Sequence, residues 1–456
     1  MIRTVAILGA SGDLTTRFLF PAFLCLHEAG HLPEGFRIIA IARDEWNTEK
    51  YRRHVEERMA ASTSQADSSS HDAVLANMDY HQGDVTDRDH MARVFGELSD
   101  PLVVYLALPP ALFHSTVEIL ASLKLPKGTK LVIEKPFGTD LASAQDLNGL
   151  LHESFPEQDV YRLDHFLGKQ TVQNILGFRF TNRVFEPLWN SQHIERVDIV
   201  WDETLTASGR ASFYDATGAL RDMIQNHLLQ LMALVGMEPL HQLNDRTLRD
   251  RKVEVLQAVR RLSPEEVARS TLRGRYGSGT IEGRDIVPYT QEKGVDPKRQ
   301  TETFAQVGLS IDNWRWAGVP FTLRTGKALG CDRREIAIRF KPVPHLAFGQ
   351  QSQPKPNVLK IELNPDRIGL SINVNTEGDF CDLDRIKLDH SFESTGLPPY
   401  ARLLLDVLDG DPMFSIRDDE AEESWRIVEP ILAVWAEGRV PLCEYPAGSD
   451  GPVEDR

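Results

Sequence analysis

The sequence contains few cysteines, and none of them has a paired spacing. Its 456 residues include four, Cys25, Cys331, Cys381 and Cys443, without a CxxC pair or another spacing typical of metal ligands. Disulfide frameworks and zinc sites both depend on such clustering. We therefore expect free thiols in a reducing compartment, with neither a disulfide scaffold nor a metal site.

Long apolar runs and an excess of positive charge are also missing. No stretch approaches the 18 consecutive apolar residues of a membrane-spanning helix, and the N-terminus lacks the apolar run and cleavage site of a signal peptide. Lysine and arginine total 51 against 67 acidic residues, and the resulting net charge of −16 repels nucleic acid and anionic lipid. These absences predict a cytoplasmic protein without nucleic-acid or membrane partners, in which any anionic ligand needs locally gathered cations.

From residue 1 to about 160, apolar strand-like runs alternate with helical patterns. The predicted strands are TVAILGA, FRIIAIAR, LVVYLALP and KLVIEKP, with helices at 14–28, 48–61, 111–123 and 140–153. Near-continuous apolar strands separated by helices are typical of a parallel sheet covered on both faces. The small, polar segment 61–73 predicts a surface loop.

After residue 190 the periodicity changes to two. Stretches such as IERVDIVWDE, VLKIELNP and RIGLSINVN suit strands with one solvent-facing side, as in an antiparallel sheet. We therefore predict two domains, residues 1–163 and residues 164–456.

A glycine-containing turn follows the first predicted strand. In VAILGASGDL, Gly9 and Gly12 precede a helix that begins near Asp13. Such a turn lets backbone N–H groups and the helix N-terminus meet a pyrophosphate. The spacing is not the full GxGxxG, so a tight strand-to-helix turn without a ligand remains an alternative.

Two further strand ends carry charged residues. Arg43 ends the second predicted strand and suits the 2′-phosphate of NADP, whereas Asp44 could accept hydrogen bonds from the ribose hydroxyls of NAD; a solvated ion pair is the third interpretation. Lys135 and Pro136 follow the fourth strand, where the ligand crevice of an open α/β sheet lies. A lysine before a proline turn is also common without any function.

The stretch RLDHFLGKQTVQN brings an acid, an imidazole and an ammonium group together. If it opens a helix, Asp164 can cap that helix, and His165 and Lys169, four residues apart, share one face that suits a phosphate. A capped surface turn without a ligand is the alternative.

The stretch RDMIQNHLLQLMALV places His227 on an apolar stripe of helical spacing, which should face inward. The stripe consists of Leu220, Ile224, His227, Leu231 and Val235. A histidine there is either a satisfied core residue or a general base whose second nitrogen is held by a carboxylate, for which the sequence offers Asp164.

The sequence resembles the glucose-6-phosphate dehydrogenases nearly end to end. The matching blocks are GASGDLTTRFLFPAF, YLALPPALF, EKPFG, RLDHFLGKQTVQN, GFRFTNRVFEPLWN, GALRDMIQNHLLQ, VPFTLRTGKALG, ARLLLDVLDGD and YPAGSDGP. The resemblance implies an α/β Rossmann-like N-terminal domain that binds NAD(P). It also implies an α+β C-terminal domain with a large, mostly antiparallel sheet for substrate binding and oligomerisation, in a homodimer or homotetramer. The implied reaction is oxidation of glucose 6-phosphate at C1 to the lactone with NADP, or with NAD as the alternative, as in the first oxidative step of the pentose phosphate pathway.

The same resemblance implies roles for individual residues. His227 resembles the base that removes the C1 hydroxyl proton, and Asp164 resembles the carboxylate that orients it. The implied substrate ligands are His165, Lys169, Glu203, Asp222, Lys327 and Lys135. The implied cofactor ligands are Gly9, Ser11, Gly12, Asp13, Leu14, Arg43, Lys135 and Pro136.

Several positions depart from the family pattern. Phe166 replaces a tyrosine and lacks its hydroxyl donor, Asp332 stands beside Arg333 where a cation is usual, and Phe18 follows Arg17 where a lysine is usual. The usual aromatic residue near the C-terminal AG..GP is absent. We favour glucose 6-phosphate because His165 and Lys169 remain. Free glucose or another 6-modified hexose, and an inactive regulatory relative, stay open as alternatives.

Overall fold

The computed structural model describes residues 1–60, 68–347, 354–375, 383–392 and 396–453. The chain forms two compact units. The first comprises residues 1–169, 241–249 and 395–422, and the second comprises residues 170–240, 250–394 and 423–456. The domain boundary predicted after residue 163 falls inside the first segment of the first unit.

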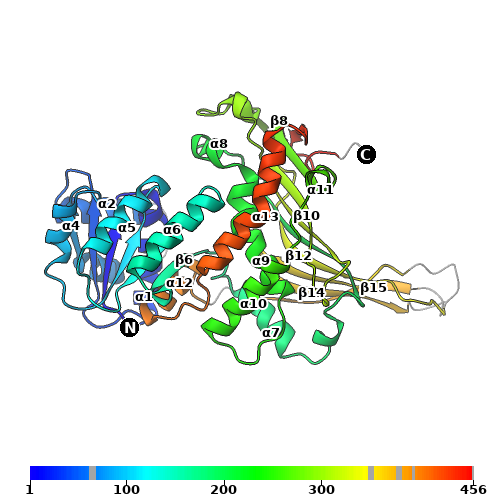
Figure 1. Cartoon of the computed structure of the whole chain (residues 1–456), viewed down its shortest axis with the longest axis horizontal. Helices are drawn as coiled ribbons and strands as arrows, with labels where there is room; N and C mark the ends of the chain where they lie inside the picture. Colours follow the sequence, from blue (N-terminus) through cyan, green and yellow to red (C-terminus); the bar gives the residue numbers. More distant parts are fainter. Residues whose placement is uncertain (61–67, 348–353, 376–382, 393–395, 454–456) are drawn as a thin grey trace. The chain divides into compact units, whose positions relative to one another are not determined.

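The first unit is built on a parallel sheet of six strands (Figure 1). The strands are β1 (Thr4–Leu8), β2 (Arg37–Ala42), β3 (Met78–Gln82), β4 (Leu102–Leu106), β5 (Lys130–Glu134) and β6 (Val160–Leu163). Their order is β3-β2-β1-β4-β5-β6, which is the order of a Rossmann fold and confirms the predicted sheet. Strands β2 and β3 are added on one side of β1, whereas β4 to β6 are added on the other side. In such a sheet a ligand crevice is expected between β1 and β4, at the carboxyl ends of these two strands.

Two groups of helices cover this sheet. The first group is the π-helix η1 (Thr15–Leu19) with α1 (Phe20–Glu28), α2 (Thr48–Ala60), α3 (Ser68–Ala76) and α12 (Pro399–Asp409); the second is α4 (Arg88–Phe95), α5 (Phe113–Ser122) and α6 (Leu141–Ser154). The loop predicted at 61–73 is wrong in part, because residues 68–73 belong to α3, whose Val74 and Leu75 are buried in the core; residues 61–67 lie outside the described part. Burial of two apolar residues outweighs the weak helix propensity of the serines before them.

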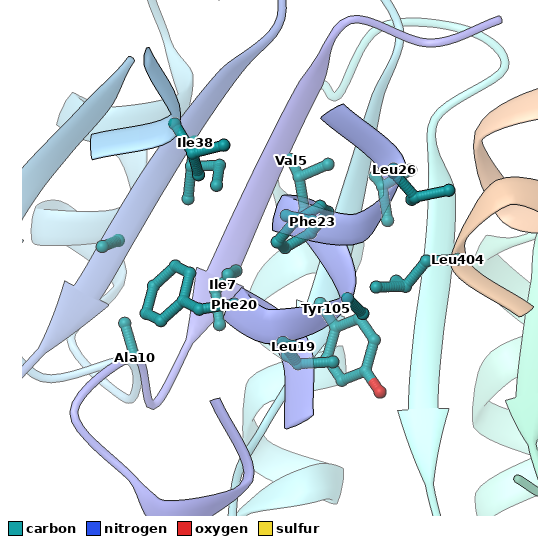
Figure 2. Packing of buried hydrophobic residues seen from close by; sticks show 14 of the residues in the cluster. Val5, Ile7, Ala10, Leu19, Phe20, Phe23, Leu26, Ile38, Tyr105 and Leu404 are labelled. Carbon is teal, nitrogen blue, oxygen red and sulfur yellow. The ribbon is translucent and has the colours of Figure 1, made fainter. Parts of the chain in front are cut away.

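Alternate strand residues build the core beneath the first group of helices. Figure 2 shows Val5 and Ile7 of β1 facing Phe20 and Phe23 of α1, with Leu404 of α12 in the same cluster. Each of these side chains is at most 1% exposed. The core of the N-terminal sheet is therefore completed by a segment from near the other end of the chain, which the sequence analysis did not anticipate.

The second unit contains a ten-stranded sheet in the order β15-β14-β13-β12-β7-β11-β10-β8-β16, with β9 paired to β8 (Figure 1). The strands are β7 (Ile194–Asp202), β8 (Thr271–Ile281), β9 (Arg284–Ile286), β10 (Phe304–Ser310), β11 (Pro320–Gly326), β12 (Arg333–Phe340), β13 (Val358–Leu363), β14 (Asp366–Asn375), β15 (Leu383–Ser391) and β16 (Leu442–Ala447). Among these strands, β7 pairs in parallel with β11 and β8 with β16, and the other pairs are antiparallel. The predicted large, mostly antiparallel sheet is confirmed.

Besides several short 3-10 turns, the other helices of the described residues are α7 (Gln170–Phe180), α8 (Ala211–Ala219), the π-helix η5 (Leu220–Leu228), α9 (Leu229–Gly236), α10 (Asp245–Ala258), α11 (Pro264–Ser270) and α13 (Asp418–Ala436). Within the described ranges, none of the helices combines the length and the apolar character needed to cross a bilayer.

Candidate active site

A cavity of about 390 Å³ lies in the first unit at the carboxyl ends of β1 to β4. Its lining is formed by Gly9, Ser11, Gly12, Ala42, Arg43, Asp44, Gly83, Asp84, Val85, Ala107, Leu108, Pro109 and Leu112. Four of the predicted cofactor residues, Gly9, Ser11, Gly12 and Arg43, are therefore together in one cavity, at the point where the strand order reverses.

Gly9 lets the end of β1 pass close to the end of β4. Its φ of 86° lies in the left-handed region, and a Cβ atom there would stand 2.3 Å from the carbonyl oxygen of Ala107. The Gly12 N–H donates to the Gly9 carbonyl at 3.0 Å and closes the turn before the helix. The sequence thus builds a close backbone approach that fits a pyrophosphate.

Four predicted cofactor residues do not line this cavity, and two of them, Asp13 and Leu14, lie directly after the glycine turn. Asp13 is exposed and forms an ion pair with Arg58 at 3.6 Å. Leu14 is half-buried and packs against the core. Side chains at a helix start can point away from the ligand while their N–H groups face it.

The rim of the cavity carries both signs of charge. Arg43 is exposed there, next to Asp44, and Asp84 follows β3 on the same edge of the sheet. Hydrogen bonds from the N–H and hydroxyl of Thr86, at 2.9 and 2.7 Å, hold the pKa of Asp84 below its usual value. Asp84 was not found from the sequence, because no spacing rule links the third strand to the glycine turn. Arg43 is thus an exposed cation on the rim of this cavity.

Lys135 and Pro136 follow β5 and are half-buried. Pro136 lines a second cavity of about 370 Å³ beside the starts of α5 and α6, not the cavity at the glycine turn. The preceding residue, Glu134, is half-buried and accepts a hydrogen bond from the Tyr105 hydroxyl. Burial raises the pKa of Glu134 to about 7. A carboxyl group that changes charge near neutral pH thus precedes Lys135.

The residues after β6 form a turn, so of the two interpretations left open for this stretch the helix that starts at Asp164 does not form. The carbonyls of Asp164 and Phe166 accept hydrogen bonds from the N–H groups three residues on, at 3.0 and 3.1 Å, and α7 begins only at Gln170. The Asp164 carboxylate accepts from the Phe166 N–H at 2.9 Å and caps this turn. His165 and Lys169 therefore share one turn and not one helical face. The pairing of Glu134 with Leu163 also places Asp164 next to Lys135 at the ends of neighbouring strands.

In the second unit, the parallel pairing of β7 and β11 brings Glu203 and Lys327 together. Asp202 is in register with Gly326, so the residues that follow the two strands emerge at the same edge of the sheet. The Lys327 ammonium lies 2.8 Å from Glu203 Oε2 and 5.3 Å from the centre of the Tyr214 ring. The structure thus joins two of the predicted substrate residues.

The cation nearest to this pair is Arg334, which the sequence analysis missed. Its Nη2 lies 3.7 Å from Glu203 Oε1 and 2.9 Å from Asp332 Oδ2. The Asp332 carboxylate also accepts from the N–H and hydroxyl of Thr204, at 2.7 and 3.0 Å. Arg333 instead pairs with Asp202 at 2.8 Å, because neighbouring residues of a strand point to opposite faces.

His227 and Asp222 lie on the π-helix η5. The segment is not the α-helix that the stripe predicted, and residues 223–236 are all buried, so no separate stripe exists. His227 is 1% exposed, which confirms its inward position, and Asp222 is half-buried. Buried Glu302 accepts from the Leu220 N–H at 3.0 Å and fixes the start of η5, and its burial raises its pKa. Glu302 has no sequence motif that could have identified it.

The predicted residues are thus distributed over both units. The first unit holds the cofactor residues with Lys135, Asp164, His165 and Lys169, and the second holds Glu203, Asp222, His227 and Lys327. The pairing of Asp164 with His227 stays a prediction.

Comparison with known proteins gives matches over almost the whole chain. Residues 6–174 match the family model described as "Glucose-6-phosphate dehydrogenase, NAD binding domain", and residues 176–456 match its C-terminal domain. Two curated glucose-6-phosphate 1-dehydrogenases, from Mycolicibacterium smegmatis and Bacillus subtilis, are 40% and 38% identical to the chain. The alignments cover 98% of the chain and 94% of the first protein, and 99% of the chain and 95% of the second.

A solved structure described as glucose-6-phosphate dehydrogenase in complex with its substrate glucose 6-phosphate superimposes with a TM-score of 0.91. It is 32% identical, and the match covers 99% of this chain and 96% of that one. On these matches, together with the Rossmann sheet and the glycine turn, the chain belongs to the glucose-6-phosphate dehydrogenase family.

Proposed function

We propose that the protein oxidises glucose 6-phosphate at C1 to 6-phosphogluconolactone and passes the hydride to NADP. The observation that carries the proposal is His227, an almost fully buried imidazole on the π-helix that also bears Asp222. A buried imidazole is suited to remove a hydroxyl proton near neutral pH, and a carboxylate on the same helix can bind sugar hydroxyls.

The first unit would hold the cofactor. The turn at Gly9 and Gly12 would receive the pyrophosphate, and Arg43 would meet the 2′-phosphate on the cavity rim. Bound NADP supplies an oxidised nicotinamide ring, which accepts the hydride. The carboxylates of Asp44 and Asp84 on the same rim would bind ribose hydroxyls.

In the chemical step, a ring nitrogen of His227 would take the proton of the C1 hydroxyl while the hydrogen on C1 leaves as hydride. The electron pair of the O–H bond then forms the carbonyl of the lactone, so charge and atoms balance. Asp164 would accept a hydrogen bond from the other ring nitrogen and stabilise the imidazolium that results.

Substrate binding divides between cations and carboxylates. His165 and Lys169, in the turn after β6, would bind the phosphate group. The paired Lys327 and Glu203, with Asp222, would bind the sugar hydroxyls.

The test is the initial rate of NAD(P)H formation with glucose 6-phosphate and with glucose, each with NADP and NAD. We expect glucose 6-phosphate with NADP to give the highest kcat/KM by orders of magnitude. Equal or faster oxidation of glucose would contradict the proposal.

A second candidate substrate is free glucose or another 6-modified hexose. It is favoured by the environment of Asp332, where Arg333 is paired with Asp202 and Arg334 with Asp332 itself. Neither guanidinium carries an uncompensated charge for a phosphate. The same four rate measurements distinguish this candidate.

We also propose a cytoplasmic homodimer or homotetramer, and the support is the end-to-end resemblance to the family. Light scattering of the purified chain would give its mass in solution, and a monomer would contradict the proposal.

A further inference from the structure

We infer that Tyr400 is a positioning residue for His165: its ring fixes the plane of the imidazole that meets the substrate phosphate. Tyr400 follows His165 by more than two hundred residues and belongs to no motif that identified the site. The inference rests on the proposed function only for the identity of the group that His165 binds.

Three rings from three parts of the first unit form an aromatic stack, which we define as Phe18, Tyr400 and His165. The Tyr400 and His165 ring centres lie 5.7 Å apart with an angle of 10° between the planes. The Phe18 and Tyr400 centres lie 5.2 Å apart at 28°. Nearly parallel rings at these separations are offset-stacked, an attractive geometry for aromatic side chains.

A further ring restrains the imidazole from another side. Phe166 meets His165 edge-on, with ring centres 5.0 Å apart and planes at 67°. Phe166 is 2% exposed and therefore fixed. Rotation of the imidazole out of this plane, about its Cβ–Cγ bond, would break the stack with Tyr400 and press the ring against Phe166, so the imidazole keeps one plane.

The backbone beneath the stack is also fixed. Tyr400 lies in the first turn of α12, whose Leu403 and Leu404 are buried in the core. A Cβ atom on Gly168, in the turn that carries His165, would stand 2.5 Å from the carbonyl oxygen of Pro399. The turn and α12 therefore touch through their backbones, and the Tyr400 ring has a defined position relative to His165.

The outer end of the stack is open to solvent. Phe18 is 43% exposed, and the Arg17 guanidinium lies 5.8 Å from the centre of its ring. The stack thus runs from the surface to His165 and makes one flank of this turn aromatic. An anion that approaches His165 meets the imidazole edge, where the N–H donors are.

The experiment is a double-mutant cycle with Tyr400→Leu and His165→Ala, measured as KM and as the calorimetric Kd for glucose 6-phosphate. Tyr400→Leu should raise both constants about three- to tenfold, with kcat and the KM for NADP within about twofold of the wild type. Tyr400→Phe, which keeps the ring, should restore wild-type values. In the His165→Ala background, Tyr400→Leu should add less than about twofold.

Two outcomes would overturn the inference. One is an equal effect of Tyr400→Leu with and without His165, and the other is a parallel loss of kcat and NADP affinity, since either indicates a merely structural role. If Tyr400→Leu does not fold, Phe18→Leu at the exposed end of the stack replaces it, with a smaller rise in KM expected.

A readout without substrate separates this inference from the proposed function. The imidazole C–H resonances of His165 should lose their ring-current shift in Tyr400→Leu and keep it in Tyr400→Phe. Suppose that the wild-type enzyme does not oxidise glucose 6-phosphate but the His165 resonances shift in Tyr400→Leu and not in Tyr400→Phe. This result would refute the proposed function but not the stack. Unchanged resonances in Tyr400→Leu would refute the stack itself.

Discussion

At the scale of single residues, the site consists of side chains that hold one another. Glu203 lies between Lys327 and Arg334, and Asp332 lies between Arg334 and Thr204. Lys327 was predicted because it belongs to a sequence block of the family, whereas Arg334 was missed because its role depends on which face of β12 it occupies. One-dimensional spacing cannot give that face without the strand register.

Replacement of His227 by asparagine tests the base. We expect kcat to fall about a hundredfold or more, with little change in the affinity for the substrate, because asparagine fills similar space but cannot take the proton. Steady-state rates with isothermal calorimetry measure both quantities, and His241→Asn, an exposed histidine, is the matched control. Near-normal turnover would remove His227 from the chemistry.

Replacement of Asp332 by asparagine tests the charge beside Arg334, which also lies next to Glu203. The variant keeps the contact with Thr204 but removes one of the two carboxylate partners of Arg334, which then has only Glu203 beside it among the ion pairs described. We expect the KM for glucose 6-phosphate to fall about two- to fivefold and this gain to shrink with added salt, because the carboxylate is 42% exposed and screened.

The KM for glucose should not change in this variant. Asp312→Asn, which breaks an exposed pair with Arg260, is the control for general charge effects. An equal gain for glucose would mean that Asp332 does not act on the phosphate.

At the scale of elements, one departure from the predicted pattern is a helix that changes its winding. The stretch around His227 was expected as an α-helix, but residues 220–228 form a π-helix. Apolar residues are so frequent there that the composition suits either winding, and the choice depends on tertiary partners such as Glu302. The strand runs, by contrast, were predictable because each is short, continuous and apolar.

Gly168 tests the contact between the turn after β6 and α12. Gly168→Ala places a methyl group against the Pro399 carbonyl, so we expect a loss of about 1–3 kcal/mol in the free energy of unfolding and a higher KM for glucose 6-phosphate. Scanning calorimetry and steady-state kinetics measure the two effects.

Gly177→Ala is the matched control for this substitution. Gly177 lies inside α7 with no atom within 4 Å of an added Cβ, and alanine favours a helix interior. The free energy of unfolding of this variant should therefore rise by about 0.5–1 kcal/mol. A neutral Gly168→Ala would show that the turn moves freely over α12.

At the scale of the whole molecule, half-buried carboxyl groups link stability to pH. Burial raises the pKa values of Glu134 and Asp406 to about 7, against 4.5 and 3.8 in ordinary groups. A raised pKa means that the folded state binds a proton that the unfolded state has lost. The contribution of protonated Glu134 to the stability of the folded state is thus fully present below pH 4.5 and is lost as the pH rises through about 7.

Glu134→Gln keeps the acceptor for the Tyr105 hydroxyl but cannot ionise. The free energy of unfolding of the variant, relative to that of the wild type, should rise on the order of 3 kcal/mol as the pH is raised from 5 to 8. Scanning calorimetry over this range measures the gain, Asp406→Asn should change in the same direction, and Glu49→Gln on the surface of α2 is the control. If the free energy of unfolding of Glu134→Gln and of the wild type changed equally with pH over this range, the raised pKa of Glu134 would be contradicted.

The two-unit architecture was only partly predictable from the sequence. The switch from continuous apolar runs to period-two runs revealed both sheets. The return of residues 395–422 to the first unit has no local signal, because Leu404 and Tyr400 look like ordinary residues of an amphipathic helix. The periodicity of apolar residues predicts local elements, but it does not show which distant segments of the chain are in contact.

This return has a consequence for the order in which the protein is made. The first unit begins at residue 1, but its core and the seat of His165 need α12, which the ribosome supplies only near the end of the chain. Translation proceeds at about 5–20 residues per second, so one face of the newly made sheet lacks α12 for on the order of ten seconds or longer. The part of the enzyme that is synthesised first is therefore among the last to be finished, and a chain that stops early leaves it open.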